Sequence, residues 1–164
     1  MPSEVWTPVY IGVGSNLCDP IAQVATARTQ ILNLPRTKSF LWSRLYRTSP
    51  VGPQDQPDYI NAVVGCVTQL GALEMLSELK SMERAMGREQ LTVRWGPRII
   101  DFDLLVFGDM QIREAMLTVP HQELAHRAFA LKPLIDIAPS LNIPGLGNVA
   151  KLAEALDQHA VETL

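Results

Sequence analysis

The sequence predicts an α/β fold of the α+β kind: a ferredoxin-like βαββαβ core with an antiparallel sheet, and extra C-terminal helices that give a three-layer α-β-α domain. Two observations predict this class. Short apolar runs with strand character alternate with longer segments whose apolar residues recur every three or four positions. The chain also has the size of a single domain, with 164 residues of which 47% are hydrophobic, so we expect one domain over residues 1–164.

The first unit of the pattern is a strand followed by a helix. Residues 9–13 form a short apolar run rich in strand-forming residues, and a Gly-Ser-Asn turn signal follows it. Asp19 is a candidate helix cap, and Pro20 is a favourable first residue of a helix. From 21 to 32 the apolar residues follow helical spacing, which predicts an amphipathic helix.

Two further strands are expected at 38–48 and 59–70, where aromatic and β-branched residues are frequent. The ten residues between them, 49–58, contain three prolines and one glycine. This connection is too long and too stiff for a tight hairpin. Loops of that length on compact domains are often functional.

The second half of the core repeats the pattern of helix and strand. A helix is expected at 73–86, ending near Gly87, and a fourth strand at 99–107. Two more helical segments, 123–137 and 149–156, are separated by a stretch rich in proline and glycine. These two helices are expected to cover the face of the sheet that the first two leave open.

Charge and composition narrow the range of partners. The formal net charge of −3 gives no global field that would gather nucleic acid. Five of the fourteen basic residues nevertheless lie within 80–98, and such a local cationic patch suits a small polyanion. The longest strongly apolar stretch, 62–67, is far shorter than the roughly 20 residues of a membrane span. With only two cysteines, we expect a cytoplasmic protein that binds neither nucleic acid nor a membrane.

Two aspartates stand in the otherwise apolar fourth strand. Because residues two apart on a strand point to the same side, Asp101 and Asp103 share one face, while Phe102 and Leu104 share the other. Two like charges roughly 7 Å apart on a partly covered sheet repel each other, and a hard divalent cation such as Mg²⁺ would offset that repulsion. The alternative is that both face water on an exposed sheet, which the short motif alone favours.

The segment just upstream favours the metal. Arg94 and Arg98 flank Trp95 and a Gly-Pro pair, so cationic donors and an aromatic plane converge on the strand that carries the acids. A magnesium-bound polyphosphate with a flat ring needs that combination. For Arg84 we favour a solvated helix face paired with an adjacent glutamate, Glu83 or Glu89. For Arg88 a solvated face and a cationic lid over phosphates remain equally open.

Four sequence blocks, in order, resemble one enzyme family. They are IGVGSNL (11–17), YRTSPVGPQDQPDYINAV (46–64), WGPR-II-DFD-LL (95–105) and LTVPHQELAHRAF (117–129). Together they are similar to the 6-hydroxymethyl-7,8-dihydropterin pyrophosphokinases of folate biosynthesis, from about Tyr10 to Pro139.

The resemblance implies a reaction and its partners. Diphosphate would pass from ATP to the hydroxymethyl group of 6-hydroxymethyl-7,8-dihydropterin, releasing AMP, on the way to tetrahydrofolate. The resemblance also implies two Mg²⁺ ions as cofactors and ATP as co-substrate. We expect the protein to act as a monomer.

The resemblance also implies the site residues. Asp101 and Asp103 would be the magnesium ligands and, with Arg88, the catalytic residues. The pterin would be bound by Thr48, Ser49, Val51, Tyr59, Asn61, Trp95 and Phe129. ATP would be bound by Glu83, Arg88, Trp95, Arg98, Thr118, His121 and Arg127.

Residue types alone leave alternatives to these roles. Tyr59 and Phe129 would more often be core residues, and His121 a surface histidine. The chain departs from the family pattern on the nucleotide side, where Gln90 and Met116 replace basic residues, so ATP affinity or turnover could be weaker than is typical. Two other functions stay open: a two-metal phosphohydrolase and a ferredoxin-like module that binds a small ligand without catalysis.

Overall fold

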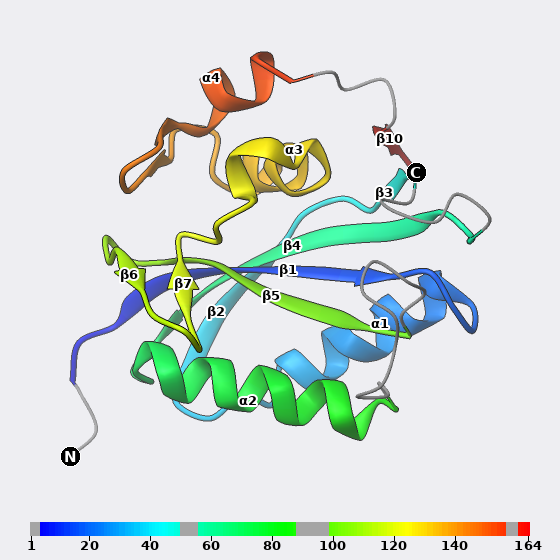
Figure 1. Ribbon diagram of the computed structural model, residues 1–164. Helices are drawn as coiled ribbons and strands as arrows, with labels where there is room; N and C mark the ends of the chain where they lie inside the picture. Colours follow the sequence, from blue (N-terminus) through cyan, green and yellow to red (C-terminus); the bar gives the residue numbers. More distant parts are fainter. Residues whose placement is uncertain (1–3, 50–55, 88–98, 157–160) are drawn as a thin grey trace.

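The computed structural model describes residues 4–49, 56–87, 99–156 and 161–164 (Figure 1). The first half contains β1 (Thr7–Ser15), α1 (Pro20–Ile31), β2 (Thr37–Trp42), β3 (Tyr46–Thr48), β4 (Tyr59–Thr68) and α2 (Ala72–Ala85). The second half contains β5 (Asp101–Phe107), β6 (Ile112–Arg113), β7 (Thr118–Val119), the 3-10 turn η1 (Leu124–His126), α3 (Ala128–Ile137), β8 (Asn142–Ile143), β9 (Gly147–Asn148), α4 (Val149–Glu154) and β10 (Val161–Thr163).

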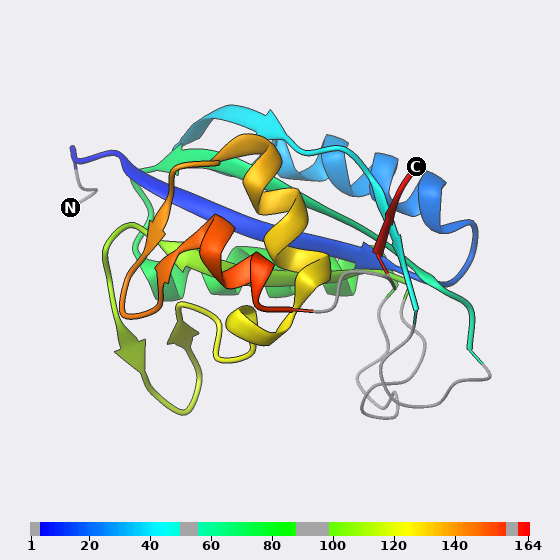
Figure 2. The ribbon, with the colours of Figure 1, turned by 90° about the horizontal axis from the view of Figure 1, so that it is seen from above.

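The main sheet is antiparallel and runs in the order β10-β3-β4-β1-β5, with β2 also paired to β4. Helices α1 and α2 lie on one face of the sheet, and α3 and α4 lie on the other (Figure 1). Seen from above, β10 runs beside β3 at one edge (Figure 2). This confirms the predicted three-layer α-β-α domain with a βαββαβ core.

The core has two layers because the central strands are covered on both faces. One cluster joins alternate residues of the sheet, such as Ile11 and Val64, to α1 and α2. The other joins Val63 and Leu105 to α3 and α4. Strand β4 is therefore apolar almost throughout, as its sequence indicated.

Several local predictions were wrong. The strand expected over 38–48 is two strands, β2 and β3, which pair with different parts of β4. Asp19 precedes α1, but its φ of 62° lies in the left-handed region, and its side chain makes no capping hydrogen bond. The helix expected over 123–137 is a 3-10 turn followed by α3.

The short hairpins β6-β7 and β8-β9 and the strand β10 were not predicted. Each pairs through only two or three residues, so it has no periodicity in the sequence. No helix in the described part of the chain is long and apolar enough to cross a membrane.

Candidate functional site

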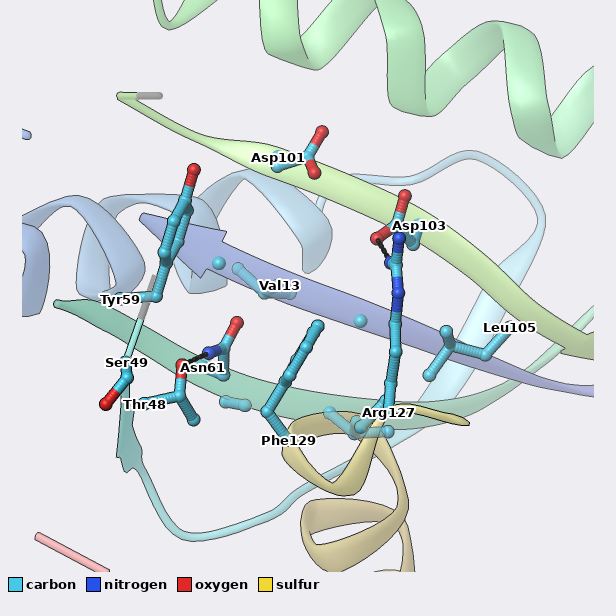
Figure 3. Close-up of a pocket in the computed structure, with 15 residues that line it drawn as sticks. Val13, Thr48, Ser49, Tyr59, Asn61, Asp101, Asp103, Leu105, Arg127 and Phe129 are labelled. Atoms are coloured by element: carbon cyan, nitrogen blue, oxygen red, sulfur yellow. Dashed lines mark hydrogen bonds and ion pairs between the residues drawn. The ribbon is translucent and has the colours of Figure 1, made fainter. Parts of the chain in front are cut away.

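A pocket opens on the α3 side of the sheet, where β1, β3, β4 and β5 meet the start of α3 (Figure 3). Its walls include the polar or aromatic residues Thr48, Ser49, Tyr59, Asn61, Asp101, Asp103, Arg127 and Phe129, and the small or aliphatic residues Gly12, Val13, Gly14 and Leu105. The fold thus brings together side chains from positions 12 to 130 of the sequence.

The floor of the pocket is formed by two glycines of β1. Gly12 lies opposite Asp103 and Gly14 opposite Asp101 in the β1-β5 register, while Gly14 also lies opposite Asn61 on β4. A Cβ atom at Gly14 would stand 2.6 Å from Asn61 Oδ1, closer than any side chain allows. Gly14 was expected in a turn but lies inside β1, where its missing side chain keeps the floor open.

One wall of the pocket carries a fixed amide. Asn61 Nδ2 donates a hydrogen bond of 2.7 Å to Thr48 Oγ1, and both residues are buried. This bond fixes the orientation of the Asn61 amide, so that its oxygen points toward Gly14. A buried amide held in this way can read the polar edge of a planar ligand.

Two aromatic side chains stand on either side of Asn61. Tyr59 comes from the start of β4, and Phe129 comes from the first turn of α3 (Figure 3). Arg127 lies at the N-cap of α3, with its guanidinium 5.4 Å from the centre of the Phe129 ring. A flat ligand that enters between the two rings would meet apolar faces on both sides and the amide at its edge.

The two aspartates project from β5 into the same pocket, as strand alternation predicted. Phe102 and Leu104 point into the core on the other face. The side chain of Asp103 is 31% exposed, and Arg127 Nη1 lies 3.5 Å from its Oδ2. Burial, and then the charge of Asp101, raise the pKa of Asp103 to about 7 although Arg127 acts in the opposite direction. The charged form of Asp103 is therefore disfavoured here, and a bound cation would act in the opposite direction.

His121 lies near the carboxylate oxygen of Asp103 that does not face Arg127. Its Nε2 lies 3.8 Å from Asp103 Oδ1, and its Nδ1 accepts a hydrogen bond of 3.1 Å from the Glu123 backbone N–H. Its own backbone N–H donates to the Leu105 carbonyl at 2.8 Å, which ties this segment to β5. Burial and the charge of Arg127 lower the pKa of His121 to about 4, so the ring is neutral at pH 7.

This pKa predicts an acid-labile contribution to stability. Between about pH 4 and the ordinary value of 6.5, the unfolded state binds a proton that folded His121 does not, so the free energy of unfolding falls as the pH falls through this range. Wild type and His121→Asn should therefore lose stability differently between pH 7 and pH 4.5, with wild type losing more. Urea unfolding at both pH values measures this; equal losses would contradict the assignment of a neutral, half-buried ring.

A second hollow lies between α2 and the β6-β7 hairpin, and Asp103 lines it as well. Its lining includes Leu76, Lys80, Leu104, Met116, Thr118 and His121. Two residues expected on the ATP side, Thr118 and His121, therefore line one hollow beside the acid pair. Met116, where the family often has a basic residue, is 80% exposed at its rim.

Glu83 lies beneath β5 and is only 2% exposed. Its Oε2 accepts a hydrogen bond of 3.3 Å from the Phe102 backbone N–H, and its Oε1 lies 3.6 Å from Lys80 Nζ. Arg84 is exposed on α2, as expected, but Glu83, one of the two glutamates considered as its partner, is buried and not part of a solvated face. Its carboxylate joins α2 to the strand that carries the aspartates, a contact that a helical pattern alone does not indicate.

Some predicted site residues lie outside the described residues: Val51, Arg88, Trp95 and Arg98, together with Arg94 and Gln90. Gly12, which forms part of the pocket floor, was not among the predicted site residues. The Gly-x-Gly spacing inside an apolar run was the available signal, because glycine within a strand often marks a close approach of another group.

Comparisons with known proteins identify the family of this chain. Residues 10–139 match the family model of the 7,8-dihydro-6-hydroxymethylpterin-pyrophosphokinases. The chain is 39% identical over 150 residues to the 2-amino-4-hydroxy-6-hydroxymethyldihydropteridine pyrophosphokinase of Haemophilus influenzae, covering 92% of this chain and 93% of that protein. It is 38% identical over 156 residues to the Pseudomonas aeruginosa enzyme of the same name, covering 95% and 96%.

Solved structures show the same fold. A Plasmodium falciparum HPPK-DHPS chain superposes with a TM-score of 0.71 at 15% identity, over 93% of this chain and 44% of that one. The chain thus spans less than half of that longer protein, whose name joins two activities. Since the family model covers most of the sequence, this chain belongs to the 7,8-dihydro-6-hydroxymethylpterin-pyrophosphokinase family.

Proposed function

We propose that this protein transfers diphosphate from ATP to the hydroxymethyl oxygen of 6-hydroxymethyl-7,8-dihydropterin and releases AMP. Family membership supports a pyrophosphokinase of folate biosynthesis. The observation that carries the proposal is a single pocket in which an amide and two aromatic rings stand beside a pair of carboxylates. Such a pocket suits a flat heterocycle whose reactive arm must meet a metal-bound phosphate.

For the pterin we propose a position between Tyr59 and Phe129, with its edge on Asn61. The hydrogen bond from Asn61 to Thr48 supports this because it leaves the amide oxygen directed into the pocket. Ser49 lies at the same wall. Val51 and Trp95 complete this set as predictions from the resemblance.

For the metal we propose Asp101 and Asp103 as ligands. Their oxygen donors fit Mg²⁺, which proteins commonly hold through one or two carboxylates plus substrate phosphates. The raised pKa of Asp103 supports this, because a bound cation would stabilise the charged form that burial and Asp101 disfavour. Bound Mg²⁺ would neutralise phosphate charge; the count of two ions is part of the proposal.

For ATP we propose the second hollow, with Thr118 and His121 along the nucleotide and Arg127 near the phosphates. The contact between the Arg127 guanidinium and Asp103 supports this, because Asp103 lines both hollows. Glu83 would act by holding β5, given its hydrogen bond to Phe102. Arg88, Trp95 and Arg98 remain predictions. Since in-line transfer needs little covalent participation, positioning and charge neutralisation by these groups would supply most of the acceleration.

We further propose that residues 1–164 act as one domain and as a monomer in the cytoplasm. The main sheet, with helices on both faces, contains strands from both ends of the chain, which supports a single domain. Some relatives carry this unit within longer bifunctional proteins, such as the Arabidopsis thaliana folate synthesis protein, of which the match covers 24%.

Release of AMP from ATP, measured with and without 6-hydroxymethyl-7,8-dihydropterin, tests the proposed reaction. We expect AMP only when the pterin and Mg²⁺ are both present. A two-metal phosphohydrolase would release product from ATP with water alone, and a non-catalytic binding module would release none. Either outcome would overturn the proposal.

Gly14→Ala is expected to weaken pterin binding by about tenfold or more, because the new methyl group would displace the Asn61 amide, and a misplaced buried hydrogen-bonding group costs about 1–3 kcal/mol. Gly12→Ala is the matched comparison: its Cβ would make ordinary contacts of 3.5 Å with Leu105, so its loss should be smaller. Fluorescence titration of the pterin measures both. Equal losses would contradict the role given to the Gly14–Asn61 contact.

A further inference from the structure

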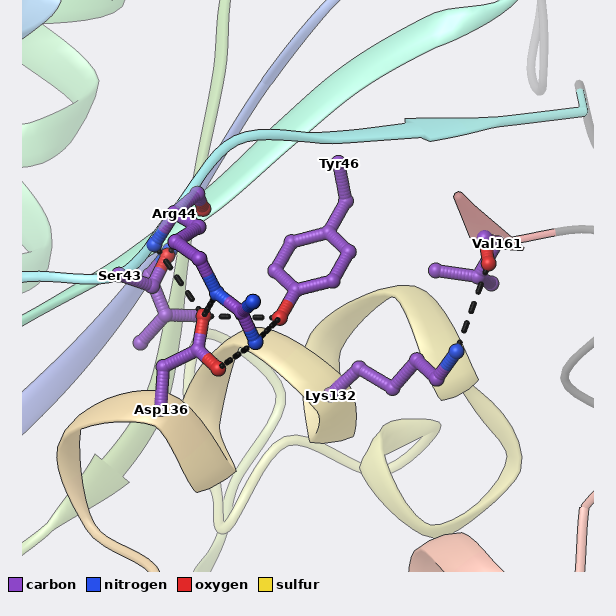
Figure 4. A network of polar contacts seen from close by, with 7 residues as sticks. Ser43, Arg44, Tyr46, Lys132, Asp136 and Val161 are labelled. Carbon is purple, nitrogen blue, oxygen red and sulfur yellow. Dashed lines mark hydrogen bonds and ion pairs between the residues drawn. The ribbon is translucent and has the colours of Figure 1, made fainter. Parts of the chain in front are cut away.

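Away from the pocket, a polar network attaches α3 to the segment that leads into β3 (Figure 4). Asp136, in the last turn of α3, accepts a hydrogen bond of 2.8 Å from the Tyr46 hydroxyl and one of 2.9 Å from Arg44 Nη2. The backbone N–H and Nε of Arg44 also donate to Asp136 Oδ2, at 3.2 and 3.3 Å. Arg44 Nη2 lies 3.2 Å from the Tyr46 hydroxyl and closes the network.

The Asp136 carboxylate is stabilised by Arg44 and Tyr46, which lie outside its own helix. An acid in the last turn opposes the helix dipole, and the Asp136 side chain is only 13% exposed. Burial alone would raise the pKa of Asp136, but the hydrogen bonds from Arg44 and Tyr46 outweigh it and hold that pKa below its ordinary value. The charged form of Asp136 therefore favours the arrangement in which α3 stays attached to the segment around Tyr46.

Tyr46 connects this attachment to the pocket. It lies opposite Asn61 in the β3-β4 register and two residues before Thr48, so all three side chains share one face. Tyr46 is 2% exposed and packs in a small cluster with Ala128, against which Phe129 also packs. Both walls of the pocket, the amide wall and the Phe129 wall, thus border the same tyrosine.

We propose that Tyr46, Asp136 and Arg44 form a positioning network, which holds α3 against β3 and thereby sets the separation between the Phe129 ring and the Asn61–Thr48 pair. The inference rests on the proposed pterin site. The three residues lie outside the lining of the pocket, so they act through Phe129 and Asn61. Asp136 lies two turns along α3 from Phe129, and Pro133 between them removes one backbone hydrogen bond of the helix. The network therefore holds the far end of α3, while the Tyr46 side chain, packed with Ala128, holds the end that carries Phe129.

Tyr46→Phe removes only the hydroxyl group and is the primary test. With Mg²⁺ and a non-hydrolysable ATP analogue present, the Kd for 6-hydroxymethylpterin should rise about fivefold in Tyr46→Phe and about tenfold in Asp136→Asn, as expected for the loss of one or more hydrogen bonds. The Kd for the nucleotide analogue should stay within about twofold. In steady-state assays the KM for the pterin should rise more than kcat falls. The Kd for the pterin in the double variant should be little higher than in Asp136→Asn alone, because both changes disrupt the same network.

Matched variants separate positioning from general loss of stability. Glu74→Gln breaks an ion pair of the same length, Arg36–Glu74 at 2.9 Å, whose carboxylate is more exposed and which lies at the start of α2 in the other helical layer; it should leave the pterin Kd unchanged. Asp136→Glu keeps the carboxylate and should recover part of the affinity. An unchanged pterin Kd in folded Tyr46→Phe would overturn the inference, as would equal weakening of pterin and nucleotide. Failure of the wild type to bind the pterin would instead overturn the proposed function.

Discussion

Asp103→Asn is expected to lower kcat by about 10³-fold, the scale expected for removing a preorganised group that stabilises transition-state charge. The substitution keeps the shape of the side chain but removes one of two carboxylates proposed to hold magnesium-bound ATP. The fold should survive, since Asp103 is crowded by the charge of Asp101. AMP release at saturating substrates measures the loss. Activity within tenfold of wild type would contradict the proposed metal site.

The same variant should be more stable than wild type at pH 8 when metal is absent. The pKa of Asp103 is raised from 3.8 to about 7, so between these values the folded protein holds a proton that the unfolded chain releases. The free energy of unfolding of the wild type therefore falls as the pH rises from about 4 to 7, and this loss is complete above pH 7. The amide that replaces the carboxyl group in the variant does not titrate, so the advantage of the variant should grow over that range.

Urea unfolding in EDTA at pH 5 and pH 8 measures this difference. Asp109→Asn is the matched control, because Asp109 is an exposed acid just beyond the end of the same strand and its neutralisation should change little at either pH. A stability gain for Asp103→Asn that is the same at both pH values would contradict the pKa argument. A loss of stability at pH 8 would show that Asp103 is already well compensated without a metal.

The central strands and the two long helices could be predicted because their patterns are local. Alternation along 99–107 was enough to place Asp101 and Asp103 on one face, since side-chain direction in a strand depends only on the backbone. The short strands β6 to β10 could not be predicted in this way. Their residues extend because a partner strand offers hydrogen bonds, and the identity of that partner is set by the whole fold.

In the candidate site, too, only the features that depend on local sequence could be predicted from the residues alone. Asn61 and Phe129 are 68 positions apart, and nothing in the sequence around either residue indicates that they share a pocket; only the family resemblance did. The burial of Glu83 likewise depends on β5 passing over α2, which brings the Phe102 N–H to its carboxylate. A helical pattern gives the face of a residue, but not the strand that will cover it.

Phe129→Ala is expected to raise the Kd for the pterin by roughly 5- to 150-fold, which corresponds to the roughly 1–3 kcal/mol that stacking of a heterocycle on an aromatic side chain contributes. Phe129 forms one wall of the pocket and is held by its place in the first turn of α3. The substitution removes the stacking surface and also the aromatic ring that lies 5.4 Å from the Arg127 guanidinium. Because α3 remains attached through Asp136, the helix itself should keep its position.

Phe129→Leu is the matched variant for this experiment, since it keeps much of the apolar area but not the flat ring. If stacking holds the substrate, the leucine variant should bind the pterin more weakly than wild type and more tightly than the alanine variant. Fluorescence titration with 6-hydroxymethylpterin in the presence of Mg²⁺ and the nucleotide analogue gives all three constants. An alanine variant that keeps the wild-type affinity would place the pterin elsewhere, because a ring bound between Tyr59 and Phe129 cannot lose one face without a cost.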